Sequence, residues 1–328
     1  MDDSNILERY PFNPILAPNK KNWWESEAVF NCATFYDGKK VHMLYRAIGE
    51  YEHYVSRIGY AFSDDGYLFK RRDKIAFDPV LDYEQFGIED PRLSKIGDQL
   101  YLTYVILSER PNAVPLVSTA LATVRNDYSK FERLGIITST GANNKDVVFF
   151  PNKFSPIKIT SDNDGAYFCL HRPSSWIGKS YGTNRPSIWI GEGNNLTRLK
   201  EHTLLMRPEQ EWEKLKIGAG PPPIKTKYGW IVIYHGVSEN SIYSAGAAIL
   251  DIENPYKIIC RSKKPILVPT TNYERLGDVD NVVFPTGVCN IDDKLFIYYG
   301  GADKVCCLAT VKVDDLVNYI FQNGTSIH

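Results

Sequence analysis

The sequence predicts an all-β fold, a five-bladed β-propeller that spans residues 1–328 as a single catalytic domain. The first observation is a unit that recurs five times: a turn of Gly, Asp or Asn, followed by a short apolar strand that ends in aromatic or basic residues. The second is that no long stretch has the apolar period of a helix, apart from a short segment at "DDLVNYIFQ". The third is composition, because 13% aromatic residues, with 21 Tyr, are typical of strands.

The five copies of this unit follow one another at even spacing. They are "DGKKVHMLYRA" (37–47), "IGDQLYLTYV" (96–105), "DGAYFCLHRP" (164–173), "KYGWIVIYHG" (227–236) and "IDDKLFIYYG" (291–300). Their starts are 59, 68, 63 and 64 residues apart, and a second strand-like run follows each copy. Four-stranded blades around a central channel account for such a period. Two β-sandwich domains are the competing interpretation, but a sandwich gives no reason for a fivefold period.

Composition and charge argue against several classes of protein. The net charge is −1, so bulk charge predicts no binding to nucleic acid or to a membrane surface. The first residues carry no signal-peptide pattern, and no apolar run approaches the about 20 residues that cross a bilayer. None of the six cysteines forms a C-x-x-C pair. We therefore expect buried thiols in a cytoplasmic protein without a metal site.

The segment "GIEDPR" (87–92) frames a pair of carboxylates between a glycine and a proline. Proline restricts the residue before it, so Asp90 is expected in extended geometry. The segment directly precedes the second copy, in the connection leading into blade two, so Asp90 is expected to face the central channel. Glu89 and Arg92 are interpreted as a local pair that keeps the turn in place.

Basic residues recur near the strand ends of the repeat, which should lie at one height around the channel. The strand ends carry Tyr45, Arg46, Tyr104, His171, Arg172, Tyr234, His235 and Tyr299. Four groups are candidates for holding an anion: Lys145, Arg172, Lys216 and His235. Together they would bind a multiply charged oxyanion, for which phosphate is the usual candidate. The alternative is that these cations are solvated or pair with local acids such as Asp146 and Glu213.

The balance of acids and cations indicates the type of reaction. An inverting glycoside hydrolase uses two carboxylates about 6.5–9.5 Å apart, but no second acid is framed as Asp90 is. Asp303 is the next best, yet it equally suits hydrogen bonding to sugar hydroxyls. Phosphate arrives ionised and needs no general base, so one acid with a cation cluster predicts phosphorolysis. The chain has neither a nucleotide-type phosphate loop nor a G-x-S-x-G elbow.

In these motifs the chain resembles glycoside hydrolase family 130, the inverting β-mannoside phosphorylases. It is most similar to the subgroup that acts on β-mannooligosaccharides and β-mannosyl-N-acetylglucosamine. The resemblance rests on ten blocks in order: "NPIL" (13–16), "VFN" (29–31), "LYRA" (44–47), "GIEDPR", "NKDVVFFPNK" (144–153), "LHRP" (170–173), "KIGAGPPPIKT" (216–226), "GWIVIYHGV" (229–237), "YERLGDVDNVVFPTG" (273–287) and "IYYGGAD" (297–303).

This resemblance implies a five-bladed propeller and a reversible, inverting phosphorolysis of β-mannosides at the non-reducing end. The product would be α-mannose 1-phosphate, with inorganic phosphate as co-substrate, no other cofactor and no metal. Asp90 matches the catalytic acid, which acts through the 3-hydroxyl of the bound mannose to protonate the glycosidic oxygen. The phosphate-holding positions are matched by Lys145, Arg172, Lys216 and His235. Sugar contacts are assigned to Asn31, Arg46, Arg92, Tyr234 and Asp303, although Tyr234 could simply pack.

Several alternatives stay open at this point. One subgroup of the family lacks the basic set and hydrolyses β-mannosides, and related propellers transfer mannose from a nucleotide sugar to build β-1,2-mannan. A non-catalytic sugar-binding propeller is a third class. The linkage (β-1,4 or β-1,2) and the acceptor (mannose or N-acetylglucosamine) depend on loops 105–116 and 174–186, where Trp176 and Tyr181 either stack on a sugar or shield the loop. The family also implies a homo-oligomer, while the physiological direction is not determined.

Overall fold

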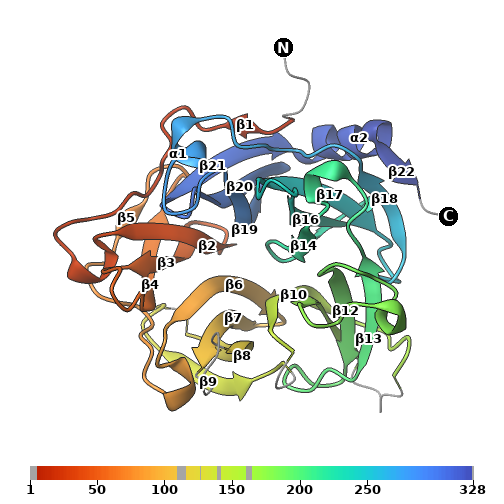
Figure 1. Ribbon diagram of the computed structural model, residues 1–328, viewed down its shortest axis with the longest axis horizontal. Helices are drawn as coiled ribbons and strands as arrows, with labels where there is room; N and C mark the ends of the chain where they lie inside the picture. Colours follow the sequence, from red (N-terminus) through yellow and green to blue (C-terminus); the bar gives the residue numbers. More distant parts are fainter. Residues whose placement is uncertain (1–5, 109–115, 126, 139–141, 160–164, 327–328) are drawn as a thin grey trace.

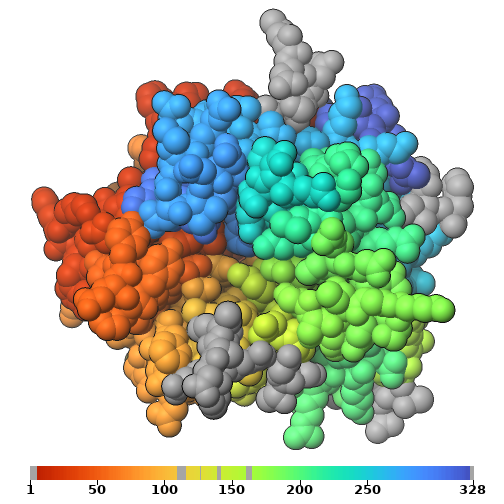
Figure 2. Space-filling view, viewed as in Figure 1, coloured from red at the N-terminus to blue at the C-terminus, as the bar shows by residue number. Residues whose placement is uncertain are grey.

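The computed structural model describes residues 6–108, 116–125, 127–138, 142–159 and 165–326. Its strands form five antiparallel sheets arranged in a ring around a central channel (Figure 1). The predicted five-bladed propeller is therefore confirmed. In the space-filling view, the face of the ring toward the viewer is hollowed at its centre (Figure 2). Within these described ranges, no helix is long and apolar enough to cross a membrane.

The blades follow one another along the chain, and each is a sheet of four or more strands. Blade 1 contains β2 (Ala28–Tyr36), β3 (Val41–Ile48), β4 (Ser56–Ser63) and β5 (Lys70–Arg71). Blade 2 contains β6 (Ile88–Ile96), β7 (Gln99–Ser108), β8 (Leu116–Val124) and β9 (Phe131–Ile136). Blade 3 contains β10 (Asn144–Phe154), β11 (Ala166–Pro173), β12 (Ile188–Gly193) and β13 (Glu201–Met206).

The last two blades also hold the ends of the described chain. Blade 4 contains β14 (Lys216–Ala219), β15 (Ile224–Thr226), β16 (Gly229–Val237), β17 (Tyr243–Leu250), β18 (Ile258–Ser262) and the late strand β22 (Gly324–Ser326). Blade 5 contains β19 (Val283–Ile291), β20 (Lys294–Gly301), β21 (Val305–Lys312) and the early strand β1 (Glu8–Arg9). The ring thus closes through β1, which pairs with β21. The described residues also form the α-helices α1 (Asn272–Arg275) and α2 (Val313–Asn323), the latter at the predicted "DDLVNYIFQ" segment.

The five repeated sequence units are the second strands of the five blades, namely β3, β7, β11, β16 and β20. The first strands β2, β6, β10 and β19 contact one another and line the channel. Residues 88–92 of "GIEDPR" belong to β6 rather than to a connection before blade 2, which corrects the prediction. All six cysteine side chains are buried, as predicted.

A β-bulge interrupts three of the channel-lining strands at the same level. The register shifts between Phe30 and Ala33 in β2, Glu89 and Arg92 in β6, and Lys145 and Val148 in β10. Inside these bulges lie three residues with left-handed backbone: Asn31 (φ 47°), Asp90 (φ 46°) and Asp146 (φ 58°). Asn and Asp tolerate this region better than other side chains. Because a bulge bends its strand, it re-aims the side chain that it carries.

The backbone of Asp90 is therefore not extended, contrary to the rule that Pro91 imposes on its predecessor. Tertiary contacts stabilise this backbone conformation, because the buried Asp90 carboxylate accepts bonds from residues of three other strands.

A buried glutamate joins a tyrosine and an arginine in four of the five blades. Each glutamate lies on a short helix before the blade or its first strand, namely η1 (Trp23–Glu25), η2 (Asp82–Glu84), η4 (Glu211–Glu213) and α1. The triads are Glu25 with Tyr45 and Arg71, Glu84 with Tyr104 and Arg133, Glu213 with Tyr234 and Arg261, and Glu274 with Tyr299 and Arg9. In blade 3 the corresponding strand positions hold His171 and His202, whose ring nitrogens lie 3.0 Å apart.

These triads correct the expectation that the strand-end tyrosines face the channel. Successive side chains on a strand point to opposite faces. The residue that follows the tyrosine, or His171 in blade 3, is the one on the channel side, as with Arg46, Arg172 and His235. The tyrosine hydroxyl on the opposite face donates to its buried glutamate.

Candidate active site

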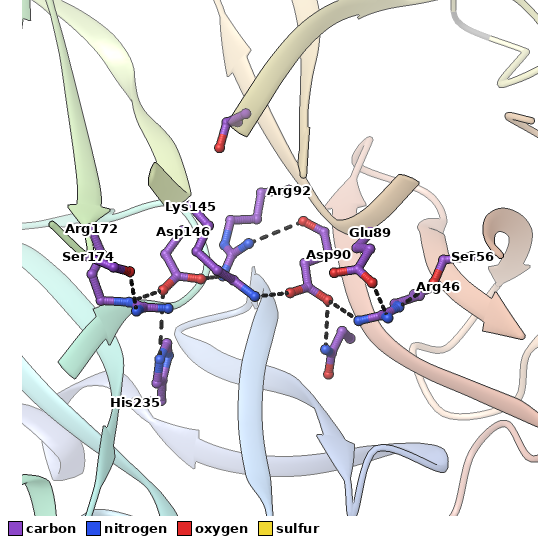
Figure 3. Close-up of polar contacts among 12 residues, drawn as sticks. Arg46, Ser56, Glu89, Asp90, Arg92, Lys145, Asp146, Arg172, Ser174 and His235 are labelled. Atoms are coloured by element: carbon purple, nitrogen blue, oxygen red, sulfur yellow. Dashed lines mark hydrogen bonds and ion pairs between the residues drawn. The ribbon is translucent and has the colours of Figure 1, made fainter. Parts of the chain in front are cut away.

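Charged and polar side chains from several strands form one connected network at the channel, and this network has two halves (Figure 3). One half surrounds Asp90 and contains Glu89 and Arg46. The other surrounds Asp146 and contains Arg172 and His235. Lys145 and Arg92 lie between the two halves. The structure therefore brings together most of the residues that the sequence predicted, from strands of four different blades.

The Asp90 carboxylate is buried and bonded on both oxygens. Its Oδ1 accepts from Asn31 Nδ2 at 2.8 Å and from an Arg46 terminal nitrogen at 3.3 Å. Its Oδ2 accepts from Lys145 Nζ at 3.1 Å. Burial by itself would raise the pKa of Asp90, but the nearby cations Lys145, Arg46 and Arg92 outweigh burial and hold that pKa well below its ordinary value. With these partners the carboxyl is ionised.

Arg46 is held in place by the Asp90 half of the network. Its Nε donates to Ser56 Oγ at 2.8 Å, and its two terminal nitrogens donate to Glu89 and Asp90. The expected local pair between Glu89 and Arg92 is therefore wrong, because Glu89 pairs with Arg46 across the blade boundary. Burial opposes the charge of Arg46, yet Glu89 and Asp90 together raise its pKa.

Arg92 has the role of a frame, as predicted, but with other partners. It donates to the backbone oxygens of Asp90, Ala219 and Gly220 and to Asp146 Oδ1. A guanidinium has five N–H donors, so these four bonds leave only one N–H group of Arg92 for a ligand. Its side chain is also 1% exposed. The structure does not support Arg92 as a direct sugar contact.

Asp146 is the centre of the second half and was not singled out from the sequence. Its Oδ2 accepts from Arg172 Nε at 2.7 Å and its Oδ1 from Arg92 at 3.1 Å, while His235 Nε2 lies 3.8 Å from Oδ2. Burial would raise its pKa, but the cations Arg172, Arg92 and Lys145 hold the pKa far below the ordinary value. Arg172 thus pairs with a local acid, which was the alternative to its binding an anion.

Lys145 is the most exposed of the charged groups in the network, with 26% of its side chain accessible. Burial disfavours its charge, but Asp90, Asp146 and Glu89 raise its pKa overall. Lys216 is half-buried on β14, and its Nζ lies 5.2 Å from the centre of the Tyr243 ring. Lys145 and Lys216 are thus the cations with the freest access to a ligand.

His235 lies below Asp146 in Figure 3 and is fully buried. Its ring packs on Phe284 at a centroid distance of 4.4 Å. Burial, more than any neighbouring charge, holds its pKa well below 6.5, so the imidazole is neutral. Among the described residues, neither ring nitrogen has a hydrogen-bond partner.

Two further predicted sugar contacts lie beside Asp90. Asn31 donates to Asp90, and its own Oδ1 is buried without a partner in the described part of the chain, which leaves an acceptor for a hydroxyl. Asp303 is close enough to Arg46 and Asp90 for their charges to affect its carboxyl group. Its pKa is raised to about 6, chiefly by burial and against the attraction of Arg46.

Tyr234 is not part of this network, which corrects its assignment to the sugar. Its side chain is fully buried, and its hydroxyl donates to Glu213 at 3.1 Å and accepts from Arg261 at 3.1 Å. Because Tyr234 and His235 are neighbours on β16, they face opposite sides, and only His235 faces the network.

Of the two loops expected to shape the acceptor side, residues 109–115 lie outside the described residues. In the second loop, Trp176 and Tyr181 stack on each other with a centroid distance of 5.9 Å and an interplanar angle of 5°. Trp176 also packs edge-on against His171 and His202. Trp176 is therefore part of blade 3, while Tyr181 remains 38% exposed.

The comparisons with known proteins agree with one another. A family model of the glycoside hydrolase 130 family, described as β-1,4-mannooligosaccharide phosphorylase, matches residues 4–322. The chain is 38% identical to the 1,2-β-oligomannan phosphorylase of Thermoanaerobacter sp. strain X514, over 94% of this chain and 98% of that protein. It is 30% identical to the β-1,4-mannooligosaccharide phosphorylase of Ruminococcus albus, over 97% of this chain and 92% of that protein.

A solved structure is also similar. The β-1,2-mannobiose phosphorylase from Listeria innocua, in complex with β-1,2-mannobiose, aligns with a TM-score of 0.82 and 28% identity, covering 96% of this chain and 99% of that one. Within the described residues, no group of three or more His, Cys, Asp or Glu side chains is placed to hold a metal ion.

Proposed function

The chain belongs to glycoside hydrolase family 130, and from this membership we propose that it is a β-mannoside phosphorylase. It would transfer the non-reducing-end mannosyl group of a β-mannoside to inorganic phosphate, with inversion, and release α-mannose 1-phosphate. The observation that carries this proposal is the buried Asp90 carboxylate, which accepts a bond from the accessible Lys145 and lies beside cations that carboxylates only partly neutralise.

The charges in the network leave room for an anion. Five cations surround the site: Arg46, Arg92, Lys145, Arg172 and Lys216. Three carboxylates oppose them: Glu89, Asp90 and Asp146. Two positive charges are in excess when Asp303 is protonated, and one when it is ionised. A phosphate anion carries matching charge, and guanidinium and ammonium groups bind its oxygens by charge-assisted hydrogen bonds.

In the proposed reaction Asp90 supplies the proton that the leaving sugar needs. Following the family resemblance, the proton passes to the 3-hydroxyl of the mannose, and the proton of that hydroxyl passes to the glycosidic oxygen. The C1–O bond breaks, and a phosphate oxygen bonds to C1 from the opposite face. Lys145, Arg172 and Lys216 would hold phosphate, and Asn31, Arg46 and Asp303 would hold the mannose. His235 would support the phosphate site from below.

Binding of phosphate would also prepare Asp90 for this role. The bond from Lys145 favours the ionised form of Asp90. An anion that engages Lys145 competes with Asp90 for that cation and adds negative charge beside it, which favours the protonated carboxyl. A phosphate that enters as the monoanion can donate the required proton, so no further acid is needed.

We further propose that β-1,2-linked mannosides are the preferred substrates. The relative that acts on 1,2-β-oligomannan is 38% identical, against 30% for the one that acts on β-1,4-mannooligosaccharides. We also infer that the chain forms a single catalytic domain. We further infer a homo-oligomeric assembly, which light scattering of the purified protein would test.

The decisive experiment is product analysis with and without phosphate. β-1,2-Mannobiose, β-1,4-mannobiose and β-1,4-mannosyl-N-acetylglucosamine are each incubated with the protein. We expect mannose 1-phosphate only when phosphate is present, and fastest from β-1,2-mannobiose. Free mannose formed equally without phosphate would make the chain a hydrolase and overturn the proposal. No product from any of the three would point to a transferase or a sugar-binding protein.

A further inference from the structure

We propose that Asp146 is a positioning residue for the phosphate site, acting through Arg172. It would fix the guanidinium by its Nε edge, so that the two terminal nitrogens stay available to the anion, and would join this arrangement to the frame around Asp90. The inference rests on the proposed function, because it assumes that phosphate is the anion that Arg172 meets.

The hydrogen bonds of Arg172 are distributed unevenly along its guanidinium. The Nε edge makes a 2.7 Å bond to Asp146 Oδ2. The terminal NH1 makes only a long bond of 3.4 Å to Ser174 Oγ, and within the described residues no other bond of the terminal nitrogens is seen. Arginine binds phosphate best through two parallel N–H donors. A guanidinium anchored at Nε keeps such a pair, whereas an unanchored one must be ordered when the anion arrives.

The second oxygen of Asp146 joins this anchor to the acid side of the network. Asp146 Oδ1 accepts from Arg92, and Arg92 donates to the backbone oxygen of Asp90. One carboxylate therefore relates the position of Arg172 to the bulge that holds Asp90. In Figure 3, Asp146 lies between Arg172 and Arg92, with His235 below it.

The surroundings of Asp146 leave its carboxylate no alternative position. Its backbone is left-handed inside the β10 bulge, and its side chain is fully buried. Gly218 on β14 packs against it: a Cβ atom at Gly218 would collide with Asp146 Oδ2 and with His235 Cε1. A side chain confined in this way holds its partner in one geometry, as a positioning residue must.

A purely electrostatic role for Asp146 makes the opposite prediction. If Asp146 only lowered the positive charge near Lys145 and Arg172, its neutralisation would strengthen the binding of phosphate. If it positions Arg172, neutralisation weakens that binding, because Asn offers one acceptor oxygen to two guanidinium groups and places its NH2 group against the other.

The test uses two variants, each with a matched control in or directly before blade 4. Asp146→Asn keeps the shape and removes the charge, and Glu213→Gln is its control, because Glu213 is an equally buried acid that binds Arg261 away from the site. Gly218→Ala keeps the charge of Asp146 and displaces the Asp146 carboxylate. Gly246→Ala is its control, since a Cβ there meets Trp212 and Tyr234 instead.

We expect Asp146→Asn and Gly218→Ala to raise the KM for phosphate by about 10- to 100-fold and to change the KM for the mannoside by less than about threefold. The controls should lose thermal stability without changing the ratio of the two KM values. A phosphate KM at or below that of the wild type, in folded Asp146→Asn, would overturn the inference. If Asp146→Asn does not fold, an unchanged phosphate KM in Gly218→Ala would do so.

Calorimetric titration of the same proteins with inorganic phosphate, without sugar, separates this inference from the proposed function. Binding to the wild type, at least tenfold weaker in Asp146→Asn, supports the positioning role even if no mannoside is turned over. Equal binding in both proteins refutes the positioning role and leaves the phosphorylase proposal intact. No binding of phosphate to the wild type refutes both.

Discussion

Replacement of Asp90 by Asn tests the centre of the proposed chemistry. The variant removes the proton donor and leaves the local structure nearly intact. Asn tolerates the left-handed backbone at this position (φ 46°), and its amide oxygen can still accept from Asn31. The bond to Lys145 is lost, but Lys145 is 26% exposed and can be hydrated instead. The fold and the phosphate site should therefore survive.

The expected loss follows from the role of the carboxyl group. General acid catalysis contributes about 10²–10⁴-fold in rate, which at 1.36 kcal/mol per tenfold corresponds to about 3–5 kcal/mol of transition-state stabilisation. We expect kcat for β-1,2-mannobiose at saturating phosphate to fall by this factor. The assay is the initial rate of mannose 1-phosphate release.

A substrate with a better leaving group separates proton donation from binding. The dinitrophenolate of 2,4-dinitrophenyl β-mannoside leaves without protonation, so the same variant should lose less than about tenfold on that substrate. A loss below tenfold on mannobiose would refute Asp90 as the acid. An equally large loss on both substrates would show that Asp90 binds the sugar rather than protonating the leaving group.

Three further predictions concern charge and stability. Lys216→Ala should raise the KM for phosphate by about tenfold or more with little change for the mannoside, and steady-state kinetics showing the reverse would contradict its role. Asp303 has a folded pKa raised to about 6, so its stabilisation is complete below about pH 4 and is lost as the pH rises through 6. Asp303→Asn should accordingly unfold in urea with about 1–2 kcal/mol more free energy than the wild type at pH 8, and with no gain at pH 4. Glu25→Gln should lower the free energy of unfolding by about 3 kcal/mol, because buried Glu25 accepts from Tyr45 and Arg71, while kinetics stay unchanged. A urea midpoint equal to that of the wild type would count against the triad as a stabilising unit.

Local rules predicted some features of the site and failed at others. Pro91 led us to expect extended backbone at Asp90, but the β6 bulge places Asp90 in the left-handed region, where bonds from Asn31 and Lys145 hold its carboxylate. The rule for residues before proline describes an isolated dipeptide, and a buried ion network can outweigh it.

The strand-end pairs show a second limit of the sequence. "YR" at 45–46 and "YH" at 234–235 show that two functional side chains are adjacent, but alternation along a strand sends only one of them to the channel. The sequence offers no signal for which one, because both types are common at sugar sites. The buried glutamates that capture the tyrosine hydroxyls come from short helices earlier in the chain, about 20 residues away.

The sequence by itself determined the repeat and hence the ring of five blades, because the periodic alternation of turn and strand is a local property that each unit carries. It also determined the chemical inventory: one framed carboxylate and several cations beside glycine and proline. The tertiary structure alone decided which charges meet. Glu89 of blade 2 pairs with Arg46 of blade 1, and Asp146 binds Arg172 of its own blade and Arg92 of blade 2. Residues tens of positions apart in the sequence converge in these contacts. Such contacts depend on bulge positions and on the closure of the ring, which are set by packing of the whole domain and leave no trace in any short segment.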